Sequence, residues 1–119
     1  MSKQPDRREL QLALFPQTPR KLQFFEVWAL AALYWPGPEV LNAVRVGELE
    51  SGFQTHAHNT AGEDSRGIWQ INVAEGAHPE LEQYNLFDPQ VNAYFAAMIW
   101  RASGWQAWYN SARTLNLIT

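Results

Sequence analysis

Residues 44–72 read VRVGELESGFQTHAHNTAGEDSRGIWQIN, and this stretch decides the fold. It begins in an apolar helical segment that carries a carboxylate, Glu50, in its last turn before Gly52. A polar crossing rich in turn residues follows, and residues 67–73 then have strand character. The order therefore predicts a carboxylate at a helix end that faces a short polar strand.

This arrangement suits proton transfer. A carboxyl group held partly out of water has a raised pKa and can donate a proton near neutral pH. Cleavage of a glycosidic bond requires such an acid beside the scissile oxygen. Val40, Leu41 and Val44 form a core-facing stripe in the expected helix 38–51, and Glu50 lies near its edge. Without further signals, an ordinary solvent-exposed carboxylate at a helix end is the alternative interpretation of Glu50.

Length and composition indicate one domain and exclude several classes. The chain has 119 residues with 46% hydrophobic and 18% charged side chains, which is an ordinary globular composition. It contains no cysteine, so no disulfide is expected to support the fold. The net charge is −3, and the basic residues concentrate before residue 22, which leaves an acidic body. Nucleic acid is therefore not the expected partner.

The N-terminal part divides into an arm and a first helix. Residues 1–19 are polar and interrupted by prolines, so we expect a loosely held arm with at most a short helical turn in residues 8–15. Residues 20–35 are apolar on nearly all faces and predict a helix buried by its neighbours. The apolar run is too short to span a bilayer and contains Glu26, and no clear cleavage site for an export signal follows it. The domain is expected to occupy residues 20–119, without stable membrane insertion.

The rest of the chain predicts an α+β fold that is predominantly α-helical. A helix is expected over residues 38–51, with Gly52 as its stop, and a small irregular β-hairpin or sheet after it. Residues 74–87 predict a loop with at most one helical turn. Asp88 and Pro89 are typical of an N-cap and a first helical residue, and this helix should continue to about residue 102. Residues 105–110 predict a final short helix.

Four motifs together resemble a known family. In chain order they are ESGF at residues 50–53, SRGIWQIN at 65–72, LFDPQVN at 86–92 and SGWQAWYN at 103–110. The first three resemble the SLT-type lytic transglycosylase domain of the lysozyme-like superfamily, and the fourth is similar to the end of animal-type lysozymes. The resemblance covers about residues 22–110. It implies a lysozyme-like fold whose small β element lies beside a catalytic cleft, and a substrate of peptidoglycan glycan strands.

The resemblance implies that Glu50 is the catalytic acid. It would protonate the leaving glycosidic oxygen between N-acetylmuramic acid and N-acetylglucosamine and then act as a base. By its position in the motif, Trp105 corresponds to the tryptophan that forms an apolar wall against the catalytic acid in lysozymes. Animal lysozymes carry a second carboxylate where this chain has Ser65, and this difference favours a mechanism with a single acid. Asp64 is a possible secondary acid, and a turn-stabilising role is its alternative.

The remaining candidates are substrate contacts. In a strand, Gln70 and Asn72 share one face, and the resemblance places that face in the cleft, where Ser65 is also expected. Purely structural amides are the alternative. Many transglycosylases carry a tyrosine where this chain has Ile99, so Tyr94 or Tyr109 is a possible substitute. The histidines at positions 56, 58 and 78 lack the spacing of a metal site, and neither a metal nor another cofactor is expected.

Three functions remain open. The first is a lytic transglycosylase, and the second is a hydrolytic muramidase, such as a lysozyme or phage endolysin, acting at the same site. The third is an inactive glycan-binding or morphogenesis module that keeps the cleft. A remoter alternative is a chitinase-like hydrolase. A monomer acting on the bacterial cell wall is expected, of either phage or bacterial origin.

Overall fold

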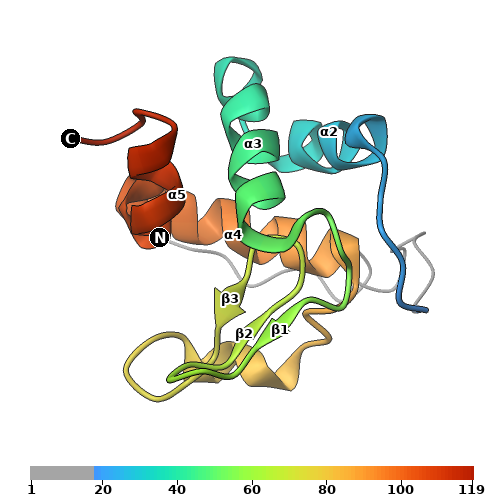
Figure 1. Ribbon diagram of the computed structural model, residues 1–119, viewed down its shortest axis with the longest axis vertical. Coiled ribbons are helices and arrows are strands. Elements are labelled where there is room, and N and C mark those ends of the chain that lie inside the picture. Colours follow the sequence, from blue (N-terminus) through green and yellow to red (C-terminus); the bar gives the residue numbers. More distant parts are fainter. Residues whose placement is uncertain (1–17) are drawn as a thin grey trace.

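Helices and a small sheet form two lobes in the computed structural model, which describes residues 18–119 (Figure 1). The helical lobe contains α2 (Phe24–Tyr34), α3 (Val40–Ser51), α4 (Pro89–Ser103) and α5 (Tyr109–Thr114). The other lobe contains the antiparallel strands β1 (His58–Asn59), β2 (Ser65–Arg66) and β3 (Ile71–Asn72), in the order β1-β2-β3. The short 3-10 helices are η1 (Gly37–Glu39), η2 (Pro79–Gln83) and η3 (Gly104–Trp108). The predicted α+β class with predominant helix is confirmed.

Helix α2 is less buried than its sequence predicts. It begins at Phe24, later than expected, where the Glu26 carboxylate accepts a hydrogen bond from the Gln23 backbone N–H at 2.9 Å. Its inner face is buried, but several large apolar side chains are exposed: Phe24, Phe25, Trp28 and Leu33. The prediction of a helix buried by its neighbours therefore holds only for the face that carries Val27, Leu30 and Ala31, since the apolar residues on the other faces are exposed although α3 and α4 pack against the helix.

Helix α3 ends where the sequence predicts. The chain enters it through η1, so the regular helix starts at Val40 rather than at Pro38. Gly52 follows with φ of 61°, a left-handed conformation that glycine adopts without steric cost. The Ser51 hydroxyl donates to the Gly47 carbonyl and accepts from the Phe53 N–H. These bonds end the helix at Ser51, one residue after Glu50.

A buried turn joins the two lobes. Trp69 is fully buried, and its indole N–H donates to the Ala43 carbonyl of α3 at 2.9 Å. A Cβ on Gly47 would lie 3.2 Å from the Trp69 indole, so the helix approaches this ring closely because residue 47 is a glycine. Asn92 of α4 accepts from the Trp69 N–H and donates to the carbonyls of Arg66 and Leu86, each at 2.9 Å. This turn is thereby held between α3 and α4.

The strand expected over residues 67–73 is shorter than predicted. Only Ile71 and Asn72 are in β3, and residues 67–70 form the turn described above. Gln70 has φ of 49°, which a continuous strand does not allow. The argument that Gln70 and Asn72 share a strand face was therefore wrong. The expectation of a small irregular sheet is confirmed by the pairs Asn59–Ser65 and Ser65–Asn72.

The C-terminal helices follow the local signals closely. The Asp88 carboxylate accepts hydrogen bonds from the N–H groups of Gln90 and Val91 and caps α4, whose first residue is Pro89. The helix ends before Gly104. The expected final helix is divided, because η3 covers residues 104–108 and α5 continues to residue 114.

Two further expectations concern the N-terminal part and the membrane. The arm predicted for residues 1–19 and its helical turn at residues 8–15 lie almost wholly outside the described residues, so the domain boundary stays a prediction. Within residues 18–119, no helix has both the length and the apolar character that crossing a membrane requires.

Candidate active site

A cleft lies between the two lobes at the end of α3. Its first chamber has a volume of about 410 Å³. Ten residues line this chamber: Glu50, Asn59, Glu63, Ser65, Gln70, Asn72, Ala107, Trp108, Tyr109 and Asn110. A second chamber of about 310 Å³ adjoins it, since Gln70, Asn72, Ala107 and Trp108 line both. We call the two chambers together the interlobe cleft.

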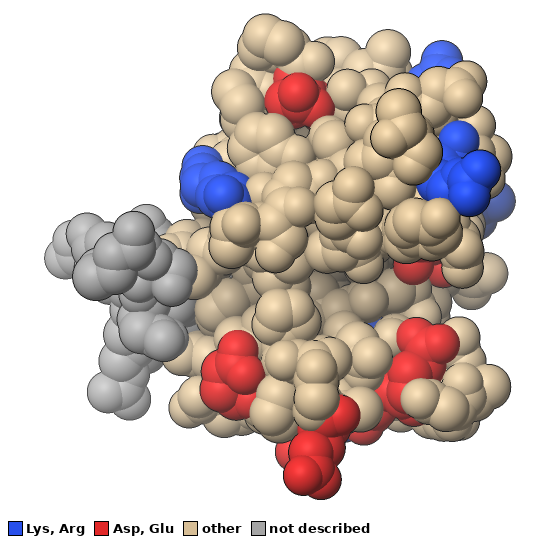
Figure 2. All heavy atoms as spheres, turned by 90° about the vertical axis from the view of Figure 1, so that its left-hand side faces the viewer, with Lys and Arg blue, Asp and Glu red and all other residues tan. Residues whose placement is uncertain are grey.

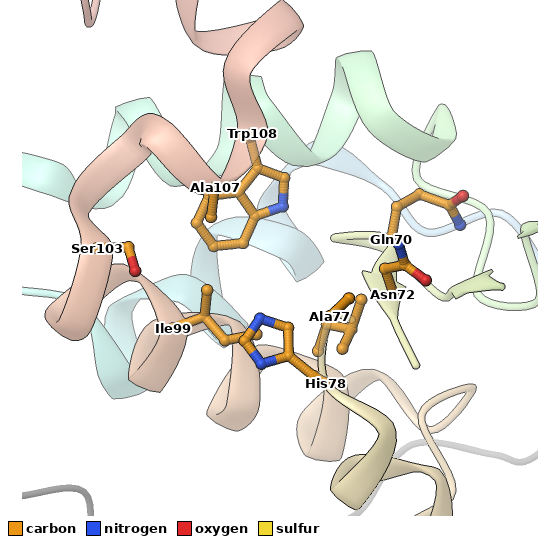
Figure 3. A pocket seen from close by; sticks show the side chains of 9 residues that line it. Gln70, Asn72, Ala77, His78, Ile99, Ser103, Ala107 and Trp108 are labelled. Carbon is orange, nitrogen blue, oxygen red and sulfur yellow. The ribbon is translucent and has the colours of Figure 1, made fainter. Parts of the chain in front are cut away.

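The cleft has walls of different chemistry. On the face shown in Figure 2, the surface is hollowed between the lobes, and Asp and Glu side chains gather on the lower lobe. In the second chamber, Trp108 and Ala107 lie on one side of the opening and Gln70 and Asn72 on the other (Figure 3). An apolar wall from η3 therefore faces a polar wall that carries these two amides, as in a groove for a ligand with apolar and polar faces, such as a sugar chain. Ile71, Ala77, His78, Ile99 and Ser103 complete the lining of this chamber.

Glu50 lies in the first chamber with its carboxyl group half-buried. Burial raises the pKa of this carboxyl above its usual value, because the charged form loses hydration. The Ser111 hydroxyl donates to Glu50 Oε2 at 2.6 Å and opposes this rise in pKa, and the negative charge of Glu63 adds to it. Glu50 therefore stays protonated to a higher pH than an exposed glutamate, and it can donate this proton to a ligand in the cleft.

The polar wall presents two amides whose orientation is partly fixed. Gln70 Nε2 donates to the carbonyls of Ala57 and Gly67, both at 3.0 Å. Asn72 Oδ1 accepts from the N–H groups of Asp64 and Ala74. Each amide therefore has a structural role, and each also lines the cleft. Ser65 lines it as well but is only 2% exposed, and its hydroxyl donates to Glu63.

Asp64, the possible secondary acid, is bound by two basic side chains and does not line the cleft. Arg66 binds it through two hydrogen bonds of 2.9 Å, and His58 contacts it at 2.7 Å. These partners lower the pKa of Asp64 to about 2. The side chain is absent from the cleft lining among the described residues, where Glu63 is present instead. The alternative of a turn-stabilising role agrees with this geometry.

Two of the expected substrate contacts lie elsewhere. The Trp105 indole N–H donates to Glu39 Oε1 at 2.9 Å, and its ring stacks on Trp35 with centroids 6.1 Å apart. The apolar wall beside Glu50 comes from Trp108. Tyr94 packs edge-on against Tyr34 and lines neither chamber of the cleft. Of the two tyrosines considered, Tyr109 lines the cleft.

Among the residues missing from the sequence-based candidates, three affect Glu50 or its chamber directly. Trp108, Ser111 and Glu63 all act on Glu50 or on its chamber. Trp108 follows Trp105 by three residues, which is one turn of a 3-10 helix, and this spacing could have indicated either tryptophan as a residue of the cleft lining. Glu63 lies two residues before Ser65, whose hydroxyl donates to its carboxylate. Nothing in the local sequence marks Ser111.

The histidines have structural neighbours. His56 stacks on Phe87 with ring centroids 5.1 Å apart, and its Nδ1 lies 2.9 Å from the Thr55 hydroxyl. His78 lines the second chamber of the cleft. Within residues 18–119, no three His, Cys, Asp or Glu side chains gather as metal ligands would.

Comparison with known families agrees with the fold and with the sequence motifs. The profile of a family described as lysozyme-like domain matches residues 34–110, which is more than half of the chain. The matched segment runs from the end of α2 to the start of α5 and contains all ten residues of the first chamber. No curated protein and no solved structure matches the chain significantly. On the family match, the chain belongs to the lysozyme-like domain family.

Proposed function

We propose that this protein cleaves the β-1,4 bond between N-acetylmuramic acid and N-acetylglucosamine in peptidoglycan, in the manner of a lytic transglycosylase. The observation that carries the proposal is Glu50, a half-buried carboxyl group with a raised pKa in a cleft between an apolar and an amide-lined wall. Membership of the lysozyme-like domain family supports a peptidoglycan-acting glycosidase.

The proposed reaction has two proton transfers. Glu50 gives its proton to the glycosidic oxygen, the C1–O bond breaks, and the electron pair of that bond goes to the leaving oxygen. The C6 hydroxyl of the same muramyl residue then adds to C1, and its proton returns to Glu50. The product is a 1,6-anhydro ring, and the enzyme regains its starting protonation state.

A hydrolytic muramidase is the second candidate. Water would replace the C6 hydroxyl in the second step, and the product would have a reducing end. The presence of another carboxylate, Glu63, in the same chamber favours this alternative, since retaining and inverting glycosidases use two carboxyl groups.

Product analysis tests the proposal. Purified peptidoglycan is incubated with the wild type, with Glu50→Gln and with Glu48→Gln, and the soluble muropeptides are identified by mass spectrometry. Glu48 is exposed on the same helix outside the cleft, so its variant controls for the loss of one charge. Anhydro-muropeptides from the wild type and from Glu48→Gln, but not from Glu50→Gln, are the expected result.

Other outcomes separate the alternatives. Reducing-end products that also depend on Glu50 would establish the hydrolase. Binding of glycan strands without any product would leave a glycan-binding module and overturn the enzymatic proposal. Cleavage of peptide-free chitin oligomers in preference to peptidoglycan would indicate a chitinase-like hydrolase.

A further inference from the structure

Glu63 occupies a defined position in the chamber that contains Glu50. It lies in the connection between β1 and β2, whose residues Asn59 and Ser65 are direct cross-strand partners. Both partners bind its carboxylate, because Ser65 Oγ donates to Oε1 and Asn59 Nδ2 donates to Oε2 at 3.1 Å. The Ala61 N–H also donates to the Asn59 side chain. The hairpin thus holds Glu63 by both oxygens on the cleft side.

Glu63 lines the first chamber without a basic partner among the described residues. Among the described residues, no lysine, arginine or histidine forms an ion pair with it. Arg66, the nearest basic residue in sequence, is instead bound to Asp64 and Glu82. The negative charge acts on Glu50, whose pKa it helps to raise. A carboxylate that is held in a fixed orientation, with no cation to neutralise it, stabilises a positive charge that develops nearby.

We propose that Glu63 is a second catalytic carboxylate, which stabilises the positive charge that develops at the anomeric carbon when the bond to the leaving oxygen breaks. This inference rests on the proposed function. Glu63 takes no proton in this step: Glu50 supplies the proton to the leaving oxygen, and the departing electron pair leaves C1 and the ring oxygen positively charged. The C6 hydroxyl or water then adds to C1 and returns its proton to Glu50.

Ser65 gains a defined role from the same geometry. Its side chain is 2% exposed, so the hydroxyl is not available to a substrate but orients Glu63. Ser65 is therefore a positioning residue. Asp64 is excluded from the catalytic role because Arg66 and His58 bind it outside the cleft.

The test compares the pH dependence of kcat and kcat/KM on purified peptidoglycan for the wild type, Glu63→Gln and Glu75→Gln. Glu75 is an exposed loop residue outside the cleft and controls for net charge. Glu63→Gln should lower kcat on its pH-independent plateau by about 10²-fold, which is the usual loss when one preorganised electrostatic group is removed. Its alkaline limb should also move to lower pH, since the charge that helps to raise the pKa of Glu50 is gone.

The other titratable side chains that line the cleft are Tyr109 and His78, and they are present in every variant. A plateau kcat of Glu63→Gln within about threefold of the wild-type value would overturn the inference. This holds even if the alkaline limb moves, because a moved limb shows only that Glu63 affects the pKa of Glu50. Thermal unfolding of each variant shows whether a rate loss reflects lost structure.

A double-mutant cycle tests the role of Ser65. Ser65→Ala should lower kcat several-fold in the wild type and have no further effect in Glu63→Gln, since it acts through Glu63. Independent effects would refute this coupling. If the wild type cleaves peptidoglycan and Glu50→Gln does not, the proposed function holds whatever Glu63→Gln shows. If the wild type has no activity, the proposed function fails first.

Discussion

Asn92→Ala is expected to destabilise the protein strongly, because one side chain holds the turn that forms the cleft wall. Asn92 is 1% exposed and makes three hydrogen bonds of 2.9 Å, one with the Trp69 N–H and two with the carbonyls of Arg66 and Leu86. Alanine leaves these backbone groups without their partner in the interior. A buried polar group that loses its partner costs about 1–3 kcal/mol.

The magnitude follows from the burial of each bond. The bonds to Trp69 and Leu86 are buried, whereas the bond to Arg66 is only partly buried and belongs at the low end of that range. Allowing for non-additivity and for water that enters the site, we expect a loss of about 3–5 kcal/mol in the free energy of unfolding. That is a large fraction of the total of about 5–15 kcal/mol for a domain.

Urea unfolding followed by tryptophan fluorescence measures this loss. Asn42→Ala is the matched control, because Asn42 makes one partly buried hydrogen bond, to Glu39 at 3.1 Å, and should lose only about 1 kcal/mol. Asn92→Asp separates the donor from the acceptor, since aspartate can still accept from Trp69 but repels the two carbonyls. An Asn92→Ala loss no larger than that of the control, or an Asn92→Asp variant as stable as the wild type, would refute the reasoning.

Two further predictions concern pH. Ser111→Ala removes the hydrogen bond that lowers the pKa of Glu50, so this pKa should rise. The alkaline limb of the pH profile of kcat/KM should then move to higher pH. A limb that moves to lower pH would contradict the assignment of Glu50 as the catalytic acid. The pKa of Asp64 is held at about 2 by Arg66 and His58, below the ordinary value of 3.8. The interactions of ionised Asp64 with Arg66 and His58 stabilise the fold above about pH 4, and this stability is lost as the pH falls through 2. The Tm of Asp64→Asn should therefore fall less between pH 4 and pH 2 than the Tm of the wild type. Equal falls of Tm would rule out this contribution.

Features that depend on neighbouring residues in the chain could be predicted from the sequence. Asp88 caps α4 because its side chain reaches N–H groups two and three residues away. Gly52 ends α3 because a residue without a side chain adopts the left-handed conformation readily. The position of Glu50 in the last helical turn follows from that stop. These features require no knowledge of the tertiary fold.

The side chains around Glu50 could not be predicted in the same way. Trp105 and Trp108 lie one turn apart on η3, on the same side of a helix that rises about 2 Å per residue. Their ring centroids are 5.6 Å apart, yet the two rings have different neighbours: Trp108 lines the chamber, and Trp105 stacks on Trp35. That choice depends on where η3 packs, because Trp108 donates to the Trp69 carbonyl at 2.7 Å.

Gln70 shows how tertiary contacts override local preference. The sequence at residues 67–73 favours a strand, yet Gly67 has φ of 81° and a Cβ there would lie 2.4 Å from the Leu86 carbonyl. Asn92 and the buried Trp69 fix the turn that follows, and Gln70 takes its positive φ as a consequence. The amide then turns toward Ala57 and the cleft. The local sequence pattern correctly placed Gln70 in the polar wall of the cleft, but it predicted a strand where the backbone forms a turn.

The hydrogen bonds of Asn92 therefore connect stability with the site. Through Trp69 they hold the turn whose carbonyl anchors Trp108. Through the Arg66 carbonyl they hold the residue before Gly67, whose own carbonyl accepts from the Gln70 side chain. The apolar wall and the polar wall of the cleft consequently depend on one buried side chain. Because Glu50 owes its raised pKa to burial, loosening this turn exposes the carboxyl to water and lowers that pKa. A variant that only weakens the turn should lose activity at alkaline pH before it loses its fold.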